Sequence, residues 1–195
     1  MTINNTIELM APAGNFESLQ AALDNGCDSV YFGVEQLNMR ARSTVNFTIE
    51  DLKEIANRCE AKKVRSYLTL NTIIYDHDLS VVKTLLNKAK DANITAVIAS
   101  DQAVIAMARS IGMEVHISTQ LNVTNIETIK FYSLFADTMV LSRELSLRQV
   151  KKITEQIEKE QIKGPNGNLV EIEIFGHGAL CMAVSGRCYL SLYSH

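Results

Sequence analysis

The stretch AVIASDQAVIAMARSIGMEVHI, residues 96–117, decides the fold because it contains a strand, a helix and a second strand in order. Residues 96–99 and 115–117 are short apolar or β-branched runs, which are typical of buried strands. Asp101 stands where the intervening helix would begin, and an aspartate there accepts hydrogen bonds from the free amides of the first turn. Two strands separated by a helix are expected to be parallel and joined by a right-handed crossover.

The same alternation extends over the rest of the chain. Further strand-like runs lie before and after this unit, and segments with helical periodicity separate them. Some polar pairs have the spacing of a capping box, in which two side chains satisfy backbone amides at a helix start. Seven strands are predicted, at residues 7–10, 29–32, 64–70, 96–99, 115–117, 138–141 and 170–175. Helix starts are predicted at Thr124 with Glu127, Ser146 with Gln149, Thr48 with Asp51, and at Asp78 and Asp101.

Strict alternation of strands and helices implies a parallel sheet, either closed into a barrel or open and doubly wound. The first strand runs into Ala11-Pro12-Ala13-Gly14, not into the G-x-G-x-x-G that binds dinucleotides in the open form. We therefore expect an α/β fold of the (β/α)8 TIM-barrel type, incomplete at the C-terminus. Residues 1–195 are expected to form the N-terminal barrel part of a longer protein, truncated within its cysteine-rich motif.

Composition narrows the class of protein. The 195 residues are 47% hydrophobic and 21% charged, which is typical of a globular domain. The start does not resemble a signal peptide, and no apolar run reaches the roughly 18 residues of a membrane span, so a cytoplasmic protein without membrane contact is expected. The formal charge of -3 gives no overall basic field, so any RNA contact would need a local patch.

Polar residues that follow the strands should gather at one face, where barrel enzymes build their sites. Arg40, Arg42 and Arg143 could bind a carboxylate or phosphate through their planar donor forks, although Arg40 and Arg42 could equally be surface charges. Glu144 is a candidate catalytic acid or base, or a partner of Arg143 at the next helix start. The predicted set is Asn38, Arg40, Arg42, Asn71, Ser118, Thr119, Gln120, Ser142, Arg143, Glu144, His177 and Cys181, with Asn71, Gln120 and the three arginines as substrate-binding candidates.

The segment from residue 173 to residue 188 differs from the other loops. Its two thiols, Cys181 and Cys188, lie seven residues apart among glycines, and thiolates are soft ligands suited to iron-sulfur clusters or zinc. Either site normally takes four ligands, so the remaining ligands are expected beyond His195. Cys27 and Cys59 are expected to be buried small hydrophobes.

Histidines and serines near the thiols allow other chemistry. His177, between two glycines, is a candidate catalytic base or proton donor, or a structural histidine. His116 lies within a predicted strand and is expected to be a hydrogen-bonded core histidine. Ser185 and Ser191 flank Cys188, but no G-x-S-x-G elbow or H-E-x-x-H motif occurs in the sequence. A peptidase mechanism therefore has no recognisable apparatus.

The thiol segment resembles the signature of the U32 peptidase family, also called the collagenase-like protease family. Residues 8–14 and 26–33 look like the first βα unit of that family, and residues 118–120 and 140–146 also resemble it. Within the family, residues 142–146 and 177–183 look closest to the branch that hydroxylates tRNA wobble uridine. The signature match covers Glu173-x-Phe175-x-x-Gly178-Ala179-Leu180-Cys181-x4-Gly186-x-Cys188-x-Leu190-Ser191.

The resemblance implies an enzyme that hydroxylates RNA without using oxygen, with prephenate as the oxygen source and a [4Fe-4S] cluster. Cys181 and Cys188 match the first two cluster ligands, and the other two would lie outside this chain. RNA, in particular tRNA, and prephenate are the implied partners, while the oligomeric state is left open. Two alternatives remain: a U32 peptidase, following the historical label, and a non-catalytic RNA-binding module.

Overall fold

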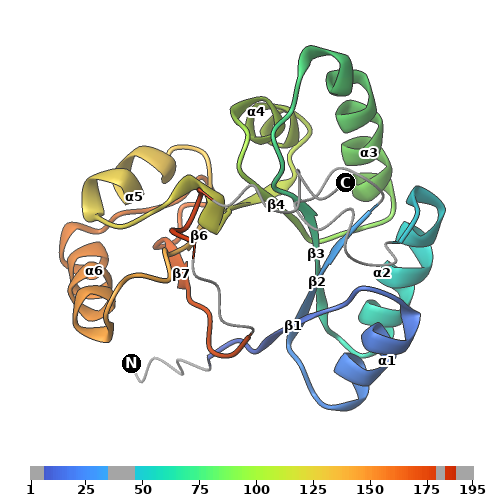
Figure 1. Cartoon of the computed structure of the whole chain (residues 1–195), viewed down its shortest axis with the longest axis horizontal. Helices are drawn as coiled ribbons and strands as arrows, with labels where there is room; N and C mark the ends of the chain where they lie inside the picture. The colour runs from blue at the N-terminus through green and yellow to red at the C-terminus, as the bar shows by residue number, and fades with distance from the viewer. Residues whose placement is uncertain (1–6, 35–46, 179–182, 188–195) are drawn as a thin grey trace.

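The computed structural model describes residues 7–34, 47–178 and 183–187. Within them, seven parallel strands form one sheet in which each strand pairs with its neighbours in the chain. The sheet curls into part of a barrel, with the helices on its outer side (Figure 1). The strands are β1 (Met10–Pro12), β2 (Ser29–Gly33), β3 (Arg65–Leu70), β4 (Ala96–Ala99), β5 (Glu114–Ile117), β6 (Thr138–Val140) and β7 (Glu171–Glu173).

An α-helix connects each of these strands to the next, as is usual for parallel βαβ units. Short 3-10 turns precede two of these helices and follow strand β5. The α-helices are α1 (Phe16–Asp24), α2 (Leu52–Ala61), α3 (Leu79–Asp91), α4 (Gln102–Ser110), α5 (Ile126–Tyr132) and α6 (Leu147–Glu160). The 3-10 turns are η1 (Ile49–Asp51), η2 (Asp76–Asp78) and η3 (Thr119–Leu121).

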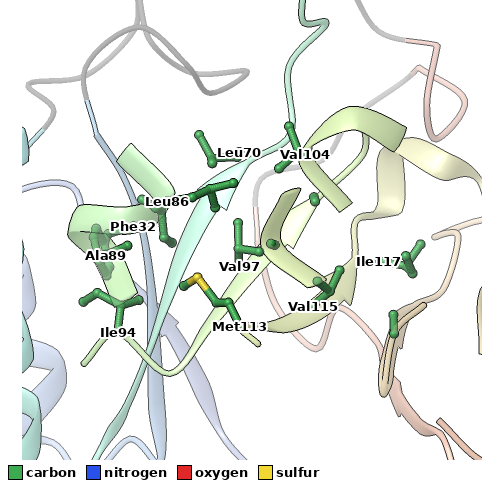
Figure 2. Close-up of a cluster of buried hydrophobic side chains, with 14 of the residues drawn as sticks. Phe32, Leu70, Leu86, Ala89, Ile94, Val97, Val104, Met113, Val115 and Ile117 are labelled. Atoms are coloured by element: carbon green, nitrogen blue, oxygen red, sulfur yellow. The ribbon is translucent and has the colours of Figure 1, made fainter. Parts of the chain in front are cut away.

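The main core lies between the outer face of the sheet and the helices. Alternate strand residues such as Phe32, Leu70 and Val97 point outward into it, because successive side chains of a strand face opposite sides. Figure 2 shows these side chains packed against Leu86 of α3 and Val104 of α4. Burial of this continuous apolar layer fixes which face of each strand looks outward.

The inner face of the sheet is different in chemistry. Its apolar cluster is small, with buried residues Tyr67, Ala96 and Ile98. By the same alternation, the remaining inner positions of β3, β5 and β7 are mostly polar or charged. The interior of the curl is therefore not the usual layer of branched apolar side chains.

The predicted α/β barrel-like fold is confirmed, with one strand misplaced. The first strand was predicted at residues 7–10 but occupies Met10–Pro12, where Met10 pairs with Ser29. Ile7 is 93% exposed, and the Leu9 carbonyl ends the ladder by accepting from the amides of Asp28 and Ser29. The last strand is also shorter than predicted, because pairing with β6 stops at Glu173.

Three of the five predicted helix starts are confirmed. Ser146 with Gln149 and Thr48 with Asp51 form capping boxes, and the Asp101 carboxylate accepts from the Ala103 amide at 2.7 Å.

Of the other two predicted starts, the one at Thr124 is wrong, and Asp78 stands at the N-cap of α3 as predicted but does not cap it with its side chain. At α5 the cap is Asn125, not Thr124, because Asn125 has the extended backbone of a cap residue and accepts from the Thr128 amide at 3.0 Å. The Asp78 carboxylate caps no amide of α3 and instead accepts from the Tyr75 amide at the start of η2.

In the part of the chain that the structure describes, no helix has both the length and the apolar character needed to cross a membrane.

Candidate functional site

Four strands deliver predicted site residues to the carboxyl-end face of the sheet. Asn71 follows β3 directly, and Gln120 lies in η3 after β5. Arg143 and Glu144 follow β6, and His177 lies in the exposed segment after β7. Arg40, Arg42, Asn38, Cys181 and Cys188 lie outside the described residues, so their predicted roles stay predictions.

The centre of the site is a set of contacts between Arg143, Glu144 and Ser185, which we call the Ser185 clamp. The Ser185 amide donates to Glu144 Oε1 at 2.7 Å. Ser185 Oγ accepts from the Arg143 amide at 3.2 Å and from Arg143 Nε at 3.4 Å. Arg143 Nη2 also donates to the Ala183 carbonyl at 3.3 Å. The loop after β6 is therefore hydrogen-bonded to the segment that lies between Cys181 and Cys188.

The clamped segment makes a tight turn against the loop after β5. The Arg187 amide donates to the Val184 carbonyl at 3.0 Å, and Gly186 occupies the third position of the turn with φ +76°. Such a φ favours glycine. A Cβ at Gly186 would lie 2.3 Å from the Gln120 carbonyl oxygen, so the turn can approach η3 this closely only without a side chain.

The loops after β5 and β6 are joined to each other beneath the turn. Ser142 Oγ donates to Asn122 Oδ1 at 2.7 Å, and the Ser142 amide donates to the Val123 carbonyl at 3.0 Å. Asn122 itself has φ 53°, a left-handed conformation that asparagine tolerates better than most residues. The clamp thus rests on a connected support formed by two strand ends.

The charge state of Glu144 suits this arrangement. Desolvation acts to raise its pKa, but hydrogen bonds from the Ser185 amide and from its own backbone amide outweigh this and hold the pKa of Glu144 below its ordinary value. Glu144 is therefore an ionised acceptor at neutral pH. An ionised carboxylate can accept a proton, so in acid–base chemistry Glu144 would act as a base.

Ser185 is the main residue that sequence reasoning missed. It is 1% exposed, and its hydroxyl accepts from the Arg143 amide and guanidinium and also makes a side-chain hydrogen bond with the Glu144 carboxylate. Its partners lie about 40 residues earlier in the chain, so no local spacing could reveal the pairing. Two features of the sequence could have indicated its role: Ser185 lies between two cysteines, and the Arg143-Glu144 dipeptide follows a strand end.

The two other cysteines lie away from this face. Cys27 and Cys59 are free thiols buried in the outer core, as expected from their apolar surroundings. Burial raises the pKa of Cys59 to about 11, which keeps the thiol protonated. In residues 7–34, 47–178 and 183–187, no three His, Cys, Asp or Glu side chains are grouped to hold a metal ion.

Comparison with known proteins gives three results. The sequence model described as "Peptidase family U32" matches residues 14–195. A protein of Porphyromonas gingivalis strain W83 named "Collagenase" is 57% identical over 98% of this chain and 46% of its own length. Proteins named "tRNA hydroxylation protein P1" in Bacillus subtilis and "tRNA hydroxylation protein P" in Escherichia coli are 33% and 35% identical over 94% and 95% of this chain and 42% and 39% of their own lengths.

The chain thus spans less than half the length of these relatives. Among solved structures, one described as a U32 peptidase superposes with a TM-score of 0.65 over 87% of this chain and 67% of that one. Its 14% identity makes this a likeness of fold.

Proposed function

Because the chain belongs to peptidase family U32, we propose that the protein is an RNA-modifying enzyme that hydroxylates the wobble uridine of tRNA, with prephenate as the oxygen source. Relatives named as tRNA hydroxylation proteins match nearly the whole chain at 33–35% identity and support this substrate class. The observation that carries the proposal is the Ser185 clamp, which fixes the segment between two thiols at the carboxyl-end face of the barrel.

A [4Fe-4S] cluster is the cofactor that best fits this donor set, since thiolates are its usual ligands. Cys181 and Cys188 would supply two of them, with the other two from outside this chain. Bound there, the cluster would supply electron-transfer chemistry at the same face. The clamp residues hold the backbone between the two thiols, so they would position these ligands.

Arg143 is the described residue best suited to meet an anionic group of the substrate. Its contacts with Ser185 and Ala183 use two of the five guanidinium N–H groups, which fixes the plane of the fork. We propose that Arg143 acts with Arg40 and Arg42 on the carboxylates of prephenate or a phosphate of tRNA, and that Asn71 and Gln120 contribute polar contacts from neighbouring loops. His177, exposed beside the thiol segment, is the proposed proton donor or base.

The cluster is tested by measuring iron and acid-labile sulfide in full-length protein purified without oxygen. We expect Cys181→Ser and Cys188→Ser each to lose most of the iron. Cys59→Ala is the matched control, since Cys59 is buried in the outer core and should keep its iron. Full iron content in both serine variants would rule out these ligands.

The substrate is tested by mass spectrometry of tRNA from a deletion strain complemented with each variant. We expect 5-hydroxyuridine derivatives to disappear in the deletion strain and to return with the unaltered gene. They should not return with Cys181→Ser.

A peptidase is the second candidate, because the relative at 57% identity carries the name collagenase. The described residues offer one serine in the thiol segment, Ser185, and its burial does not suit a nucleophile that must reach a peptide substrate. Cleavage of gelatin by iron-free full-length protein would favour this candidate over RNA hydroxylation.

A further inference from the structure

The interior of the barrel contains a group of titratable side chains that the site at the face does not use. Three alternate strands each contribute one: Tyr67 from β3, His116 from β5 and Glu173 from β7. Alternate strands supply the side chains of one interior layer in a βα barrel, and branched apolar residues usually fill that layer. A tyrosine, a histidine and a glutamate in those positions need a physical explanation.

His116 is held with one ring nitrogen committed. The residue is 3% exposed, and its ring centroid lies 4.6 Å from that of Tyr67. His116 Nε2 lies 3.1 Å from Glu114 Oε1. This hydrogen bond lowers the pKa of Glu114, which is therefore an ionised acceptor. Nε2 must then carry the hydrogen, so Nδ1 is the nitrogen that can gain or lose a proton.

A second buried polar atom in this layer is the carboxylate oxygen Oε2 of Glu173. It is shielded from solvent and, like His116 Nδ1, has no hydrogen-bond partner among the described residues. Burial raises the pKa of Glu173, and the charge of a protonated His116 opposes that rise, so the two groups lie within electrostatic reach of each other. Thr69 Oγ1, at an inner position of β3, is also buried without a described partner, whereas Ser29 Oγ, at an inner position of β2, lies within hydrogen-bond reach of the Tyr67 hydroxyl.

Three unsatisfied polar atoms on one inner face are a built polar site, because buried polar groups are almost always hydrogen-bonded in folded proteins. We propose that His116 Nδ1 and Glu173 Oε2 share one proton across a hydroxyl-bearing ligand, a water molecule in the resting protein, and form a buried acid–base site beneath the carboxyl-end face. The proton has two positions. When the O–H bond of Glu173 breaks and the N–H bond of His116 forms, a neutral pair becomes an imidazolium and a carboxylate with the same total charge.

The neighbouring charges are arranged to leave this proton between the two groups. Tyr67 donates to Glu8 Oε1 at 2.8 Å, and Arg65 forms an ion pair with Glu8, so these charges compensate each other below the layer. Burial raises the pKa of Tyr67, which stays a neutral phenol. Among the described residues, the Glu114 carboxylate is the charged group that contacts the His116 ring.

The pair lies close enough to the face to serve the reaction. The Leu141 amide donates to the Glu173 carbonyl at 2.9 Å, which places Glu173 beside the strand end that leads to the Ser185 clamp. His116 is two residues from Ser118, about 7 Å along a strand. Delivery of the proton to a bound substrate rests on the proposed function, whereas proton sharing inside the barrel does not.

The shared proton is tested by nuclear magnetic resonance of full-length protein labelled with nitrogen-15 in histidine and carbon-13 in glutamate. We expect one proton on the pair at pH 7, seen as an imidazolium at His116 or as a protonated Glu173 carboxyl. Neutral His116 beside an ionised Glu173 would overturn the proposal. This measurement needs no variant, so a misfolded variant does not leave the question open.

Variants then test the coupling and the role. In Glu173→Gln we expect the share of His116 in the imidazolium form at pH 7 to fall, since a facing carboxylate is lost. Glu171→Gln, on the exposed part of the same strand, should leave it unchanged. An unchanged share in Glu173→Gln would contradict the coupling. Loss of tRNA hydroxylation in Glu173→Gln with retained iron would show that the pair also takes part in catalysis. If the wild-type protein hydroxylates no tRNA, the proposed function fails. The resonance measurement still decides whether the proton is shared.

Discussion

At the scale of single residues, Glu144 separates a positioning role from acid–base chemistry. Its carboxylate accepts from the Ser185 amide, and a glutamine oxygen can accept the same hydrogen bond. We therefore expect Glu144→Gln to retain most of the bound iron and Glu144→Ala to lose most of it. Iron content and tRNA hydroxylation should be measured in both variants.

Iron content and hydroxylation together distinguish the two roles of Glu144. If Glu144→Gln keeps both iron and hydroxylation, the residue positions the thiol segment. Retained iron with abolished hydroxylation would instead mark Glu144 as the base that the sequence suggested. A loss of iron in Glu144→Gln equal to that in Glu144→Ala would contradict the clamp.

Gly186 offers a second test at this scale. An alanine there would meet the Gln120 carbonyl oxygen and would also have to adopt φ +76°. Gly167 is the matched control, because it has φ +82° but no atom within 4 Å of an added Cβ. Strain alone costs about 1–3 kcal/mol in either variant. We expect Gly167→Ala to keep its iron and Gly186→Ala to lose it, and equal behaviour of the two would contradict close packing of the turn on η3.

At the scale of elements, the start of α5 can be tested by two adjacent substitutions. Asn125→Ala removes the side chain that accepts from the Thr128 amide, and loss of such a cap costs about 1 kcal/mol. Thr124→Ala should cost less than about 0.5 kcal/mol, as most substitutions outside such features do. Urea unfolding of both variants measures the difference, and a larger loss in Thr124→Ala would restore the capping box predicted from the sequence.

The elements themselves could be predicted from the sequence because their signals are local. Apolar or β-branched runs of three to seven residues predicted the strands, and Asp101 and Ser146 marked helix starts through contacts within a few residues. The start of β1 could not be found this way. Its ladder depends on the amides of Asp28 and Ser29, which lie far along the chain from Leu9.

The candidate site shows the same limit more strongly. The rule that sites lie at strand ends located Gln120, Arg143 and Glu144, but it could not show that Arg143 and Glu144 hold Ser185. The polar interior was also out of reach, because an isolated histidine or glutamate in a strand gives no hint of what it faces across the barrel. The alternation of side chains along a strand shows which side of the sheet a residue faces, but it does not show which residues it meets there.

At the scale of the whole molecule, the interior layer should make stability depend on pH. Burial raises the pKa of Glu173 in the folded state above its value in the unfolded chain, so the folded state holds the proton more tightly. The stability that this proton confers is present at low pH and is lost as pH rises through the folded-state pKa. The free energy of unfolding of Glu173→Gln, relative to wild type, should therefore increase with pH across that window and then level off.

Urea unfolding of the full-length protein over a series of pH values measures this difference. Glu171→Gln is again the control, because Glu171 is exposed and should track wild type at every pH. A difference between Glu173→Gln and wild type that stays constant from acid to neutral pH would show that Glu173 is ionised equally in both states.

Because every strand pairs with the strands directly before and after it in the chain, no pairing in the described sheet has to wait for a distant segment. When Tyr67 is synthesised, its pairing partner Tyr31 is already present. The same holds for Ala96, which pairs with Tyr67, and for Glu114, which pairs with Ala96. The chain can therefore lengthen its sheet one βα unit at a time as it leaves the ribosome. The loop that carries Ser185 is made after the seven described strands, so it can join the face only once the strands that support it exist.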